Sequence, residues 1–246
     1  MRDFHHPGRS AVYAENGMCA TSHPLAAQTA IATLQAGGNA VDAAIAGAVL
    51  LGLCEPAMTG IGGDCFVLVK PAGSEDIVAL NGSGRAPAAL SGAALRAEGH
   101  TKMPVFGHPA AVTIPGAVDA FCRLSEDYGK LGLDALLAPT IHYAEAGVPA
   151  APRAQFDWTH HHDNLTPTAR RHYLIDDRPP RLGERFRHPG QAEVLRRVAR
   201  EGRKGFYEGE VAEDMVAALK ALGGVHTLED FAGTACDYTT PVSGSY

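Results

Sequence analysis

The chain of 246 residues lacks a long hydrophobic run. Its longest apolar stretch, Ala40–Leu53, contains Asp42 and is shorter than the roughly 20 residues that a membrane-spanning helix needs. Residues 1–8 contain no apolar core of the kind that secretory signal peptides carry. We therefore expect no membrane span and a cytoplasmic location.

An excess of basic residues is also missing. Lys and Arg number 21 against 27 Asp and Glu, which gives a net charge of −6. A nucleic-acid-binding surface needs a basic field, so we expect no nucleic acid as partner. The densest basic run, residues 196–204, is interpreted as the solvated face of a helix.

Paired cysteines and an obvious metal motif are absent as well. The five cysteines form no CxxC pair and are predicted to be reduced, buried thiols; a catalytic cysteine is only a minor alternative. The one dense group of metal-ligand types, His160–Asp163, is consecutive, so its side chains point in different directions. We interpret it as an exposed loop or helix end, and we expect neither a metal nor another cofactor.

The spacing of apolar residues predicts many helices and a few short strands. Pro24 is expected to begin a helix that ends at Gly37, and Asn39 to cap a buried helix over Ala40–Leu53. Further helices are predicted over Val118–Gly129, Leu133–Ala146, Gln191–Glu201 and Val211–Leu222, with a short one capped by Thr227. Pro139 is expected to begin a new helical turn, and residues 151–189 to be the least regular part.

Strands are predicted at four places. Cys65–Val69 and Ile77–Asn81 are expected to form an antiparallel pair, the first of them buried, and Val112–Pro115 a third strand. Ala11–Ser22 is interpreted as a hairpin or strand. No linker divides the chain, so residues 1–246 are treated as one domain.

The glycine-rich run Thr59–Asp64 permits three interpretations. A phosphate-binding loop requires the order strand, glycines, helix, whereas here a helix precedes and a strand follows, and no GK[ST] is present. A nucleotide-binding module is therefore disfavoured. The remaining interpretations are a tight turn that needs positive φ angles, and closely packed backbone beside an active site.

Eight short motifs, in order along residues 11–246, resemble the γ-glutamyltransferase (γ-glutamyltranspeptidase) family. They are Gly37–Ala44, Glu55–Pro56, Thr59–Phe66, Thr113–Gly116, Tyr128–Gly129, Ala144–Gly147, Gly205–Gly209 and Thr227–Phe231. The resemblance implies an α+β fold, the αββα sandwich of N-terminal-nucleophile hydrolases, of which this chain is the helix-rich large-subunit part. Residues 1–246 are then a single incomplete domain.

The resemblance also implies a mechanism and a partner. A precursor cuts itself before a Thr, whose hydroxyl is the nucleophile and whose α-amine is the general base, and γ-glutamyl or related amides of the glutathione type react through an acyl-Thr ester. The catalytic residue is not expected in this chain, because cleavage at Thr239 or Thr240 leaves at most eight residues. The implied partners are a small subunit or C-terminal segment that carries the Thr and a small-molecule amide substrate, with a homo-oligomer left open.

The substrate clamp departs from the family pattern. Family members carry an Arg in an Arg-Glu-x-Ala-Pro pattern, which binds the α-carboxylate of the donor. Alignment on Ala86–Pro87 places Ser83 at that position and Arg85 two residues later. We take Arg85 and Ser83 as the candidate substrate-binding residues, with a surface or structural role for Arg85 as the alternative. A non-glutamyl amidohydrolase and a non-catalytic structural subunit are the alternative functions.

Overall fold

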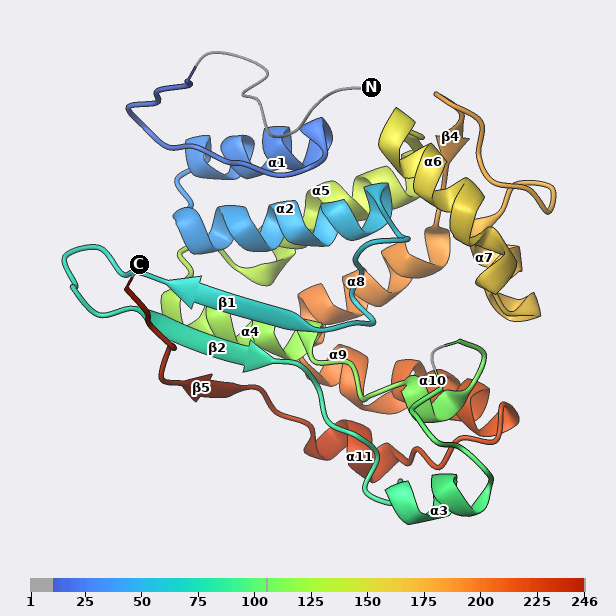
Figure 1. Cartoon of the computed structure of the whole chain (residues 1–246). Coiled ribbons are helices and arrows are strands. Elements are labelled where there is room, and N and C mark those ends of the chain that lie inside the picture. Colours follow the sequence, from blue (N-terminus) through green and yellow to red (C-terminus); the bar gives the residue numbers. More distant parts are fainter. Residues whose placement is uncertain (1–10, 105, 246) are drawn as a thin grey trace.

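The structure is a computed structural model and describes residues 11–104 and 106–245. Along the chain its elements are α1 (Pro24–Gln35), α2 (Ala40–Cys54), β1 (Cys65–Val69), β2 (Val78–Gly82), α3 (Gly92–Ala97), the 3-10 helix η1 (Pro109–Ala111), α4 (Ala117–Tyr128), α5 (Leu133–Ala146), β3 (Val148–Pro149), α6 (Pro152–His161), the 3-10 helix η2 (His162–Asn164), α7 (Pro167–Tyr173), β4 (Arg185–Phe186), α8 (Pro189–Glu201), α9 (Lys204–Tyr207), α10 (Gly209–Ala221), α11 (Leu228–Gly233) and β5 (Asp237–Thr239). Figure 1 shows their arrangement.

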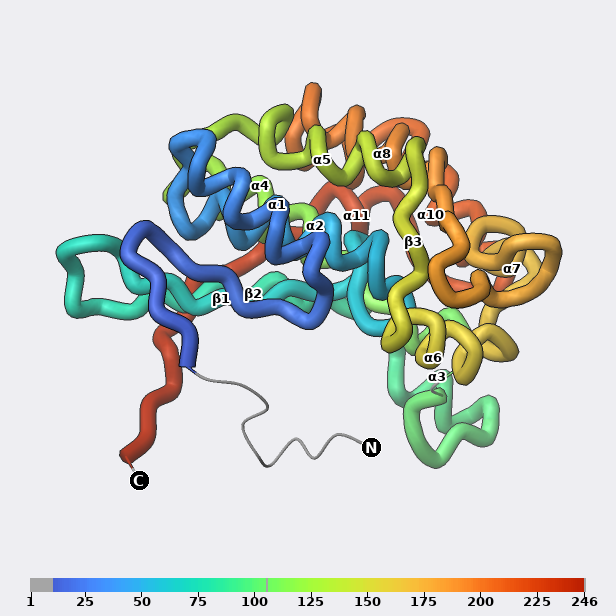
Figure 2. The backbone as a smooth tube through the Cα atoms, turned by 90° about the horizontal axis from the view of Figure 1, so that it is seen from above, coloured from blue at the N-terminus to red at the C-terminus, as the bar shows by residue number. Residues whose placement is uncertain are grey.

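A three-stranded antiparallel sheet in the order β1-β2-β5 forms one layer of the molecule. In Figures 1 and 2 helix α4 lies behind this sheet and α5 lies behind α2, and the front face of the sheet carries no described helix. The predicted antiparallel pair is therefore confirmed, with the second strand shifted by one residue. The helices predicted from apolar spacing are confirmed within two residues at either end.

Helix α2 lies at the centre of the helical layer and is buried along most of its length. Asn39 caps it as predicted, and Asp42 completes a reciprocal capping box. The Asp42 carboxylate has no exposed surface and also accepts hydrogen bonds from the backbone of Lys130 and Leu131. One carboxylate thus stabilises the start of α2 and fixes the loop that leads into α5.

A second set of buried hydrogen bonds connects α4 to the C-terminal part of the chain. The hydroxyl of Tyr207, which is fully buried, donates to the carbonyl of Pro115 at 2.7 Å and accepts from the amide of Asp119 at 3.0 Å. Asp119 in turn pairs with Arg203 at 2.7 Å and accepts from the amide of Cys236. These contacts fix the positions of α9 and the strand β5 relative to α4.

Two predicted strands are wrong. Val112–Pro115 runs beside the segment after β2 but makes one backbone bond there, from the Ile114 amide to the Arg85 carbonyl. Pro115 has no amide hydrogen to extend the pairing. Ala11–Ser22 is irregular and mostly exposed, because its alternating residues meet no partner strand among residues 11–104 and 106–245.

Two helical predictions also need correction. Pro139 lies inside α5 rather than at a helix start, because α5 is packed against both α2 and α8, and this packing outweighs the missing hydrogen bond. Residues 151–189 are more regular than expected, since Pro152 and Pro167 each begin a short helix. The cluster His160–Asp163 lies at the end of α6 and in η2, as expected.

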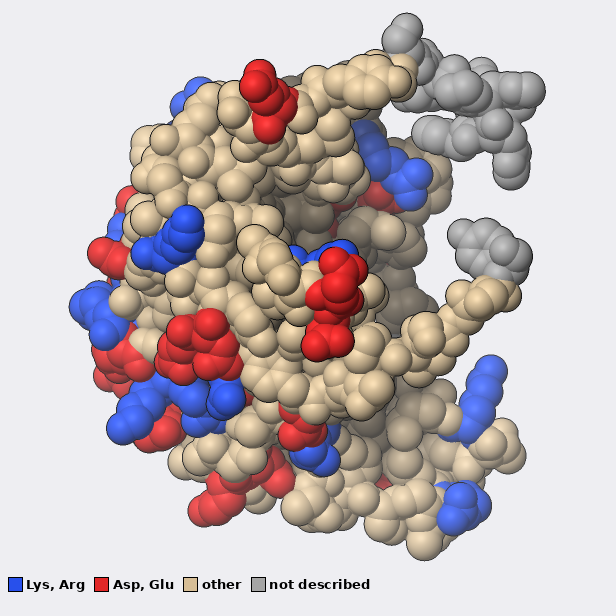
Figure 3. All heavy atoms as spheres, turned by 90° about the vertical axis from the view of Figure 1, so that its left-hand side faces the viewer, with Lys and Arg blue, Asp and Glu red and all other residues tan. Residues whose placement is uncertain are grey.

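No helix in the described ranges is long and apolar enough to span a membrane. Basic and acidic side chains are interspersed on the face drawn in Figure 3. All five cysteines are free thiols, of which Cys54 and Cys122 are buried.

Candidate functional site

The front face of the sheet is not covered by a described helix, and it carries both exposed apolar side chains and a polar end. Phe66 and Leu68 of β1 are 67% and 69% exposed, so the prediction that this strand is buried is wrong for one of its two faces. Phe66 pairs with Asn81, and Asn81 pairs with Asp237, so these three side chains share the open face. A shallow cavity of about 420 Å³ lies on this face. We call the surface around Asn81 and Asp237 the polar end of the open face.

Glycines fix the backbone that leaves this end of β2. Gly84 has φ +74°, and a Cβ on it would overlap the carbonyl oxygen of Ile114. A Cβ on Gly116 would likewise overlap the carbonyl oxygen of Gly82. Together with the bond from the Ile114 amide to the Arg85 carbonyl, at 2.8 Å, this close packing holds the segment from Gly82 to Arg85 in place.

Both sequence-predicted residues lie at the polar end. The Ser83 amide donates to Asn81 Oδ1 at 3.0 Å, and the Ser83 hydroxyl donates to the carbonyl of Gly84 at 3.3 Å. The Arg85 guanidinium donates to Asp237 Oδ2 at 2.8 Å, with 67% of its side chain exposed. The structure therefore brings Ser83 and Arg85 together and adds Asn81 and Asp237, which sequence reasoning missed.

The glycine run Thr59–Asp64 is a helix-to-strand turn that lies beside this segment. The Gly63 carbonyl accepts hydrogen bonds from the amides of Gly116 and Ala117, at 3.0 and 3.1 Å. The run is therefore separated from Gly84 by one layer of backbone. The expectation of positive φ angles in the run is wrong, because none of its glycines adopts one. The glycines instead allow close packing of the backbone, since a Cβ on Gly52 of α2 would lie 3.0 Å from the Cα of Gly60.

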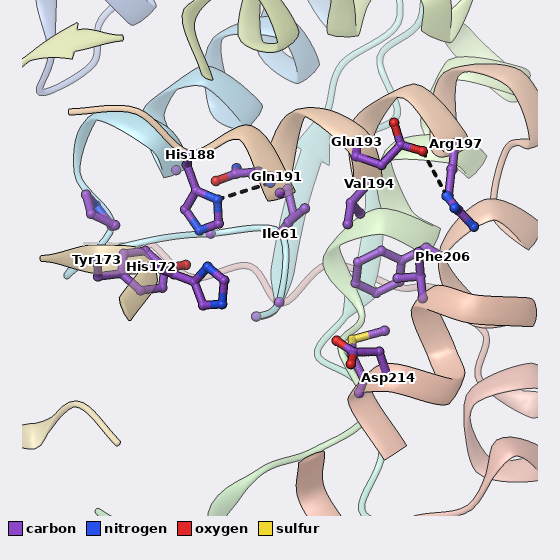
Figure 4. Close-up of a pocket in the computed structure, with 18 of the residues that line it drawn as sticks. Ile61, His172, Tyr173, His188, Gln191, Glu193, Val194, Arg197, Phe206 and Asp214 are labelled. Carbon is purple, nitrogen blue, oxygen red and sulfur yellow. Dashed lines mark hydrogen bonds and ion pairs between the residues drawn. The ribbon is translucent and has the colours of Figure 1, made fainter. Parts of the chain in front are cut away.

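A second cavity, of about 600 Å³, lies on the other side of the glycine run, between α7, α8 and α10 (Figure 4). Its walls are largely apolar, with Ile61, Val194 and Phe206 among them. Burial and the neighbouring His172 lower the pKa of His188, so this imidazole is neutral at pH 7. Such a cavity is suited to an apolar group, but its lining residues present no activated nucleophile.

The thiols near these sites are poor nucleophiles. Burial, and to a smaller extent Asp64, raises the pKa of Cys65 to about 11. Burial and the hydrogen-bonded carboxylate of Asp119 raise the pKa of Cys236 to about 12. Both thiols stay protonated at neutral pH, which disfavours a thiolate mechanism.

One cluster of metal-ligand types was not anticipated from the sequence. Glu98, His100 and His108 place their ligand atoms within 4.8 Å of one another. However, His108 Nδ1 accepts a hydrogen bond from the amide of Ala110, so the neutral ring carries its proton on Nε2. That tautomer has no free lone pair for a metal, and the cluster therefore does not fit a metal site as it stands.

Comparison with known proteins agrees with the motif resemblance. Residues 26–246 match the gamma-glutamyltranspeptidase family model. The chain is 33% identical to the glutathione hydrolase-like YwrD proenzyme of Bacillus subtilis, over 93% of this chain and 44% of that protein. It is 36% identical to the oxamate amidohydrolase proenzyme of Klebsiella pneumoniae, over 87% and 42% respectively.

A solved structure gives the fold. The cephalosporin acylase of Bacillus halodurans superimposes with a TM-score of 0.90 and 41% identity, over 99% of this chain and 47% of that one. The helix-rich chain thus has the N-terminal-nucleophile hydrolase fold in part, and it spans less than half the length of these relatives. The chain belongs to the gamma-glutamyltranspeptidase family.

Proposed function

We propose that this chain is the large-subunit part of an N-terminal-nucleophile enzyme that cleaves or transfers γ-glutamyl or related amides of the glutathione type. The observation that carries the proposal is the polar end of the open face, where the Arg85 guanidinium is exposed beside Ser83 on a backbone fixed by glycines. An exposed guanidinium binds a carboxylate with two parallel hydrogen bonds. We expect the chain alone to be inactive.

In this proposal the reaction is acyl transfer through an ester on the Thr of the small subunit or C-terminal segment. Its α-amine, with an ordinary pKa of about 8, takes the hydroxyl proton as the oxygen attacks the amide carbonyl. Collapse of the tetrahedral intermediate releases the amine, which leaves with that proton, and water or an acceptor amine then cleaves the ester. In this scheme Arg85 and Ser83 bind and orient the substrate, and they take no part in bond making.

A second candidate is a hydrolase of non-glutamyl amides. It is favoured by Ser83, which stands where the γ-glutamyl enzymes carry their carboxylate-binding Arg. A relative named as an oxamate amidohydrolase, at 36% identity, supports the same candidate. Because Arg85 lies two residues further on, a substrate with a different spacing between carboxylate and amide is the expected consequence.

The partner in this proposal is a small subunit or C-terminal segment that covers the open face of the sheet. Phe66 and Leu68 expose apolar surface there, which soluble proteins normally cover. The relatives are proenzymes of more than twice the matched length, which leaves ample chain for this role. We place the enzyme in the cytoplasm, and we leave a homo-oligomer as an additional arrangement.

Intact-mass analysis of the native gene product tests the proposal. We expect two fragments, the smaller beginning with Thr, and hydrolysis of a γ-glutamyl anilide or, for the second candidate, of oxamate. A single uncut chain that hydrolyses neither compound contradicts both candidates and supports a non-catalytic structural subunit. Release of ammonia from oxamate without release of aniline selects the second candidate.

A further inference from the structure

Asp237 is the residue at the polar end for which neither the motifs nor the reaction scheme provides a role. It begins β5, pairs across the sheet with Asn81, and accepts a hydrogen bond from Arg85 at 2.8 Å. Asn81 in turn holds the Ser83 amide. The cross-strand pair Asn81–Asp237 thus contacts both residues that we assign to substrate binding.

The contact with Asp237 sets the direction of the Arg85 side chain. The Arg85 backbone is fixed by Ile114, but within residues 11–104 and 106–245 its guanidinium makes no side-chain hydrogen bond other than the one to Asp237. Arg has high rotamer entropy, which a single anchored N–H reduces. A guanidinium has five N–H donors, so one bond to Asp237 leaves an edge free for a second carboxylate.

The strand that carries Asp237 is itself well anchored. The Tyr238 hydroxyl donates to Asp127 Oδ2 at 2.6 Å, and the Cys236 amide donates to Asp119 at 2.7 Å. The residues on both sides of Asp237 are therefore tied to α4. An anchored carboxylate can hold a flexible cation in one direction, whereas a carboxylate on a loose loop cannot.

On the basis of the proposed function, we propose that Asp237 is a positioning residue, which holds the Arg85 guanidinium so that its free edge binds the carboxylate of the amide substrate. Asp237 also carries a negative charge close to that carboxylate. Because Asp237 is 56% exposed, water and salt weaken this repulsion to about a factor of two in affinity. Positioning and repulsion act in opposite directions, so their effects can be separated by substitution.

The test uses the full-length, self-processed protein and two substrates. The first is a γ-glutamyl anilide, and the second is the same anilide with its α-carboxylate replaced by a carboxamide. Asp237→Ala is expected to raise KM for the first about five-fold, the factor that corresponds to about 1 kcal/mol, with kcat within two-fold of wild type. KM for the carboxamide is expected to stay unchanged.

Asp237→Asn separates positioning from charge, because the amide oxygen still accepts a hydrogen bond. We expect it to raise KM for the carboxylate substrate no more than about two-fold. The matched control is Glu75→Ala, which removes the exposed Lys70–Glu75 ion pair at the other end of the same sheet. It is expected to change neither KM.

The proposal is overturned if Asp237→Ala and Asp237→Asn both lower KM, which would mean repulsion alone, or if both substrates respond equally, which would mean a general structural role. A wild-type enzyme that does not distinguish the two anilides also overturns it, while leaving the proposed function intact. If the wild type hydrolyses neither anilide, the γ-glutamyl form of the proposed function fails, and calorimetry with glutamate and with its α-amide decides the inference. Tighter binding of glutamate that Asp237→Ala weakens about five-fold supports it, and no binding of glutamate overturns it.

Discussion

The glycine packing behind Ser83 and Arg85 leads to a sharp prediction for Gly84→Ala. Two costs arise, of which the first is the positive φ of +74°, an unfavourable region for an L-residue that costs about 1 kcal/mol. The second is the collision of the new Cβ with the Ile114 carbonyl, which pushes the two backbone segments apart and costs about 2 kcal/mol more. We expect a total loss in unfolding free energy of about 3 kcal/mol.

Gly73→Ala is the matched control. Gly73 lies in the turn between β1 and β2 with φ +77°, but a Cβ there would meet nothing within 4 Å. This substitution therefore carries only the φ cost, about 1 kcal/mol. Urea unfolding of the full-length protein and its two variants gives both free energies.

The same variants report on function. Displacement of the segment from Gly82 to Arg85 is expected to raise KM for the substrate in Gly84→Ala, whereas Gly73→Ala leaves KM unchanged. If Gly84→Ala is no more destabilising than Gly73→Ala, the close packing against Ile114 is not a constraint, and the argument that glycines fix the site is refuted.

Three further predictions concern the scaffold and the open face. Asp42→Ala leaves the backbone amides of Asn39, Lys130 and Leu131 without their buried acceptor and is expected to lower the unfolding free energy by about 3 kcal/mol. Asp134→Ala, on the first turn of α5, is expected to change it by less than about 1 kcal/mol, and equal losses in urea melts would contradict the role of Asp42. Burial raises the pKa of Asp119, but hydrogen bonds from Cys236 and Arg203 outweigh it and hold the pKa below its usual value, so the stability that this carboxylate contributes is present above about pH 4 and is lost as pH falls through the folded-state pKa. The difference in unfolding free energy between wild type and Asp119→Asn is expected to be about 2 kcal/mol at pH 7 and to shrink below about pH 4 in urea melts across pH, whereas a constant difference argues against this role. The double substitution Phe66→Ser and Leu68→Ser is expected to weaken assembly with the partner segment, measured by size exclusion, and to reduce the fluorescence of a hydrophobic dye bound to the isolated chain. Unchanged assembly would mean that the open face is not the contact surface.

Local patterns predicted the helices well because their causes are local. Asn39 and Asp42 cap α2 within four residues, and Pro24 begins α1 at a position where its missing amide costs nothing. Pro139 was misjudged because the packing of α5 between two helices lies outside any local window. Tertiary packing outweighed the intrinsic preference of that residue.

The site was only partly visible in the sequence. Ser83 and Arg85 could be put forward as candidates because a family pattern could be aligned on Ala86–Pro87. Asp237 was not found, since it lies 152 positions from Arg85 and begins a strand of three residues that has no apolar alternation. Val112–Pro115 shows the reverse error, in which a strand-like pattern forms a single backbone bond because a proline ends it.

The open face of the sheet has a consequence for biosynthesis. Under the proposed function, β1 and β2 leave the ribosome well before the segment that covers them, and the relatives imply that more than half of the protein is still to be made. At the usual 5–20 residues per second this delay is on the order of tens of seconds. During that interval Phe66 and Leu68 stand on an edge strand, the arrangement from which sheets recruit other chains. Yield of the enzyme should therefore depend on chaperone capacity and on slow synthesis at low temperature, and not only on the stability of the finished molecule.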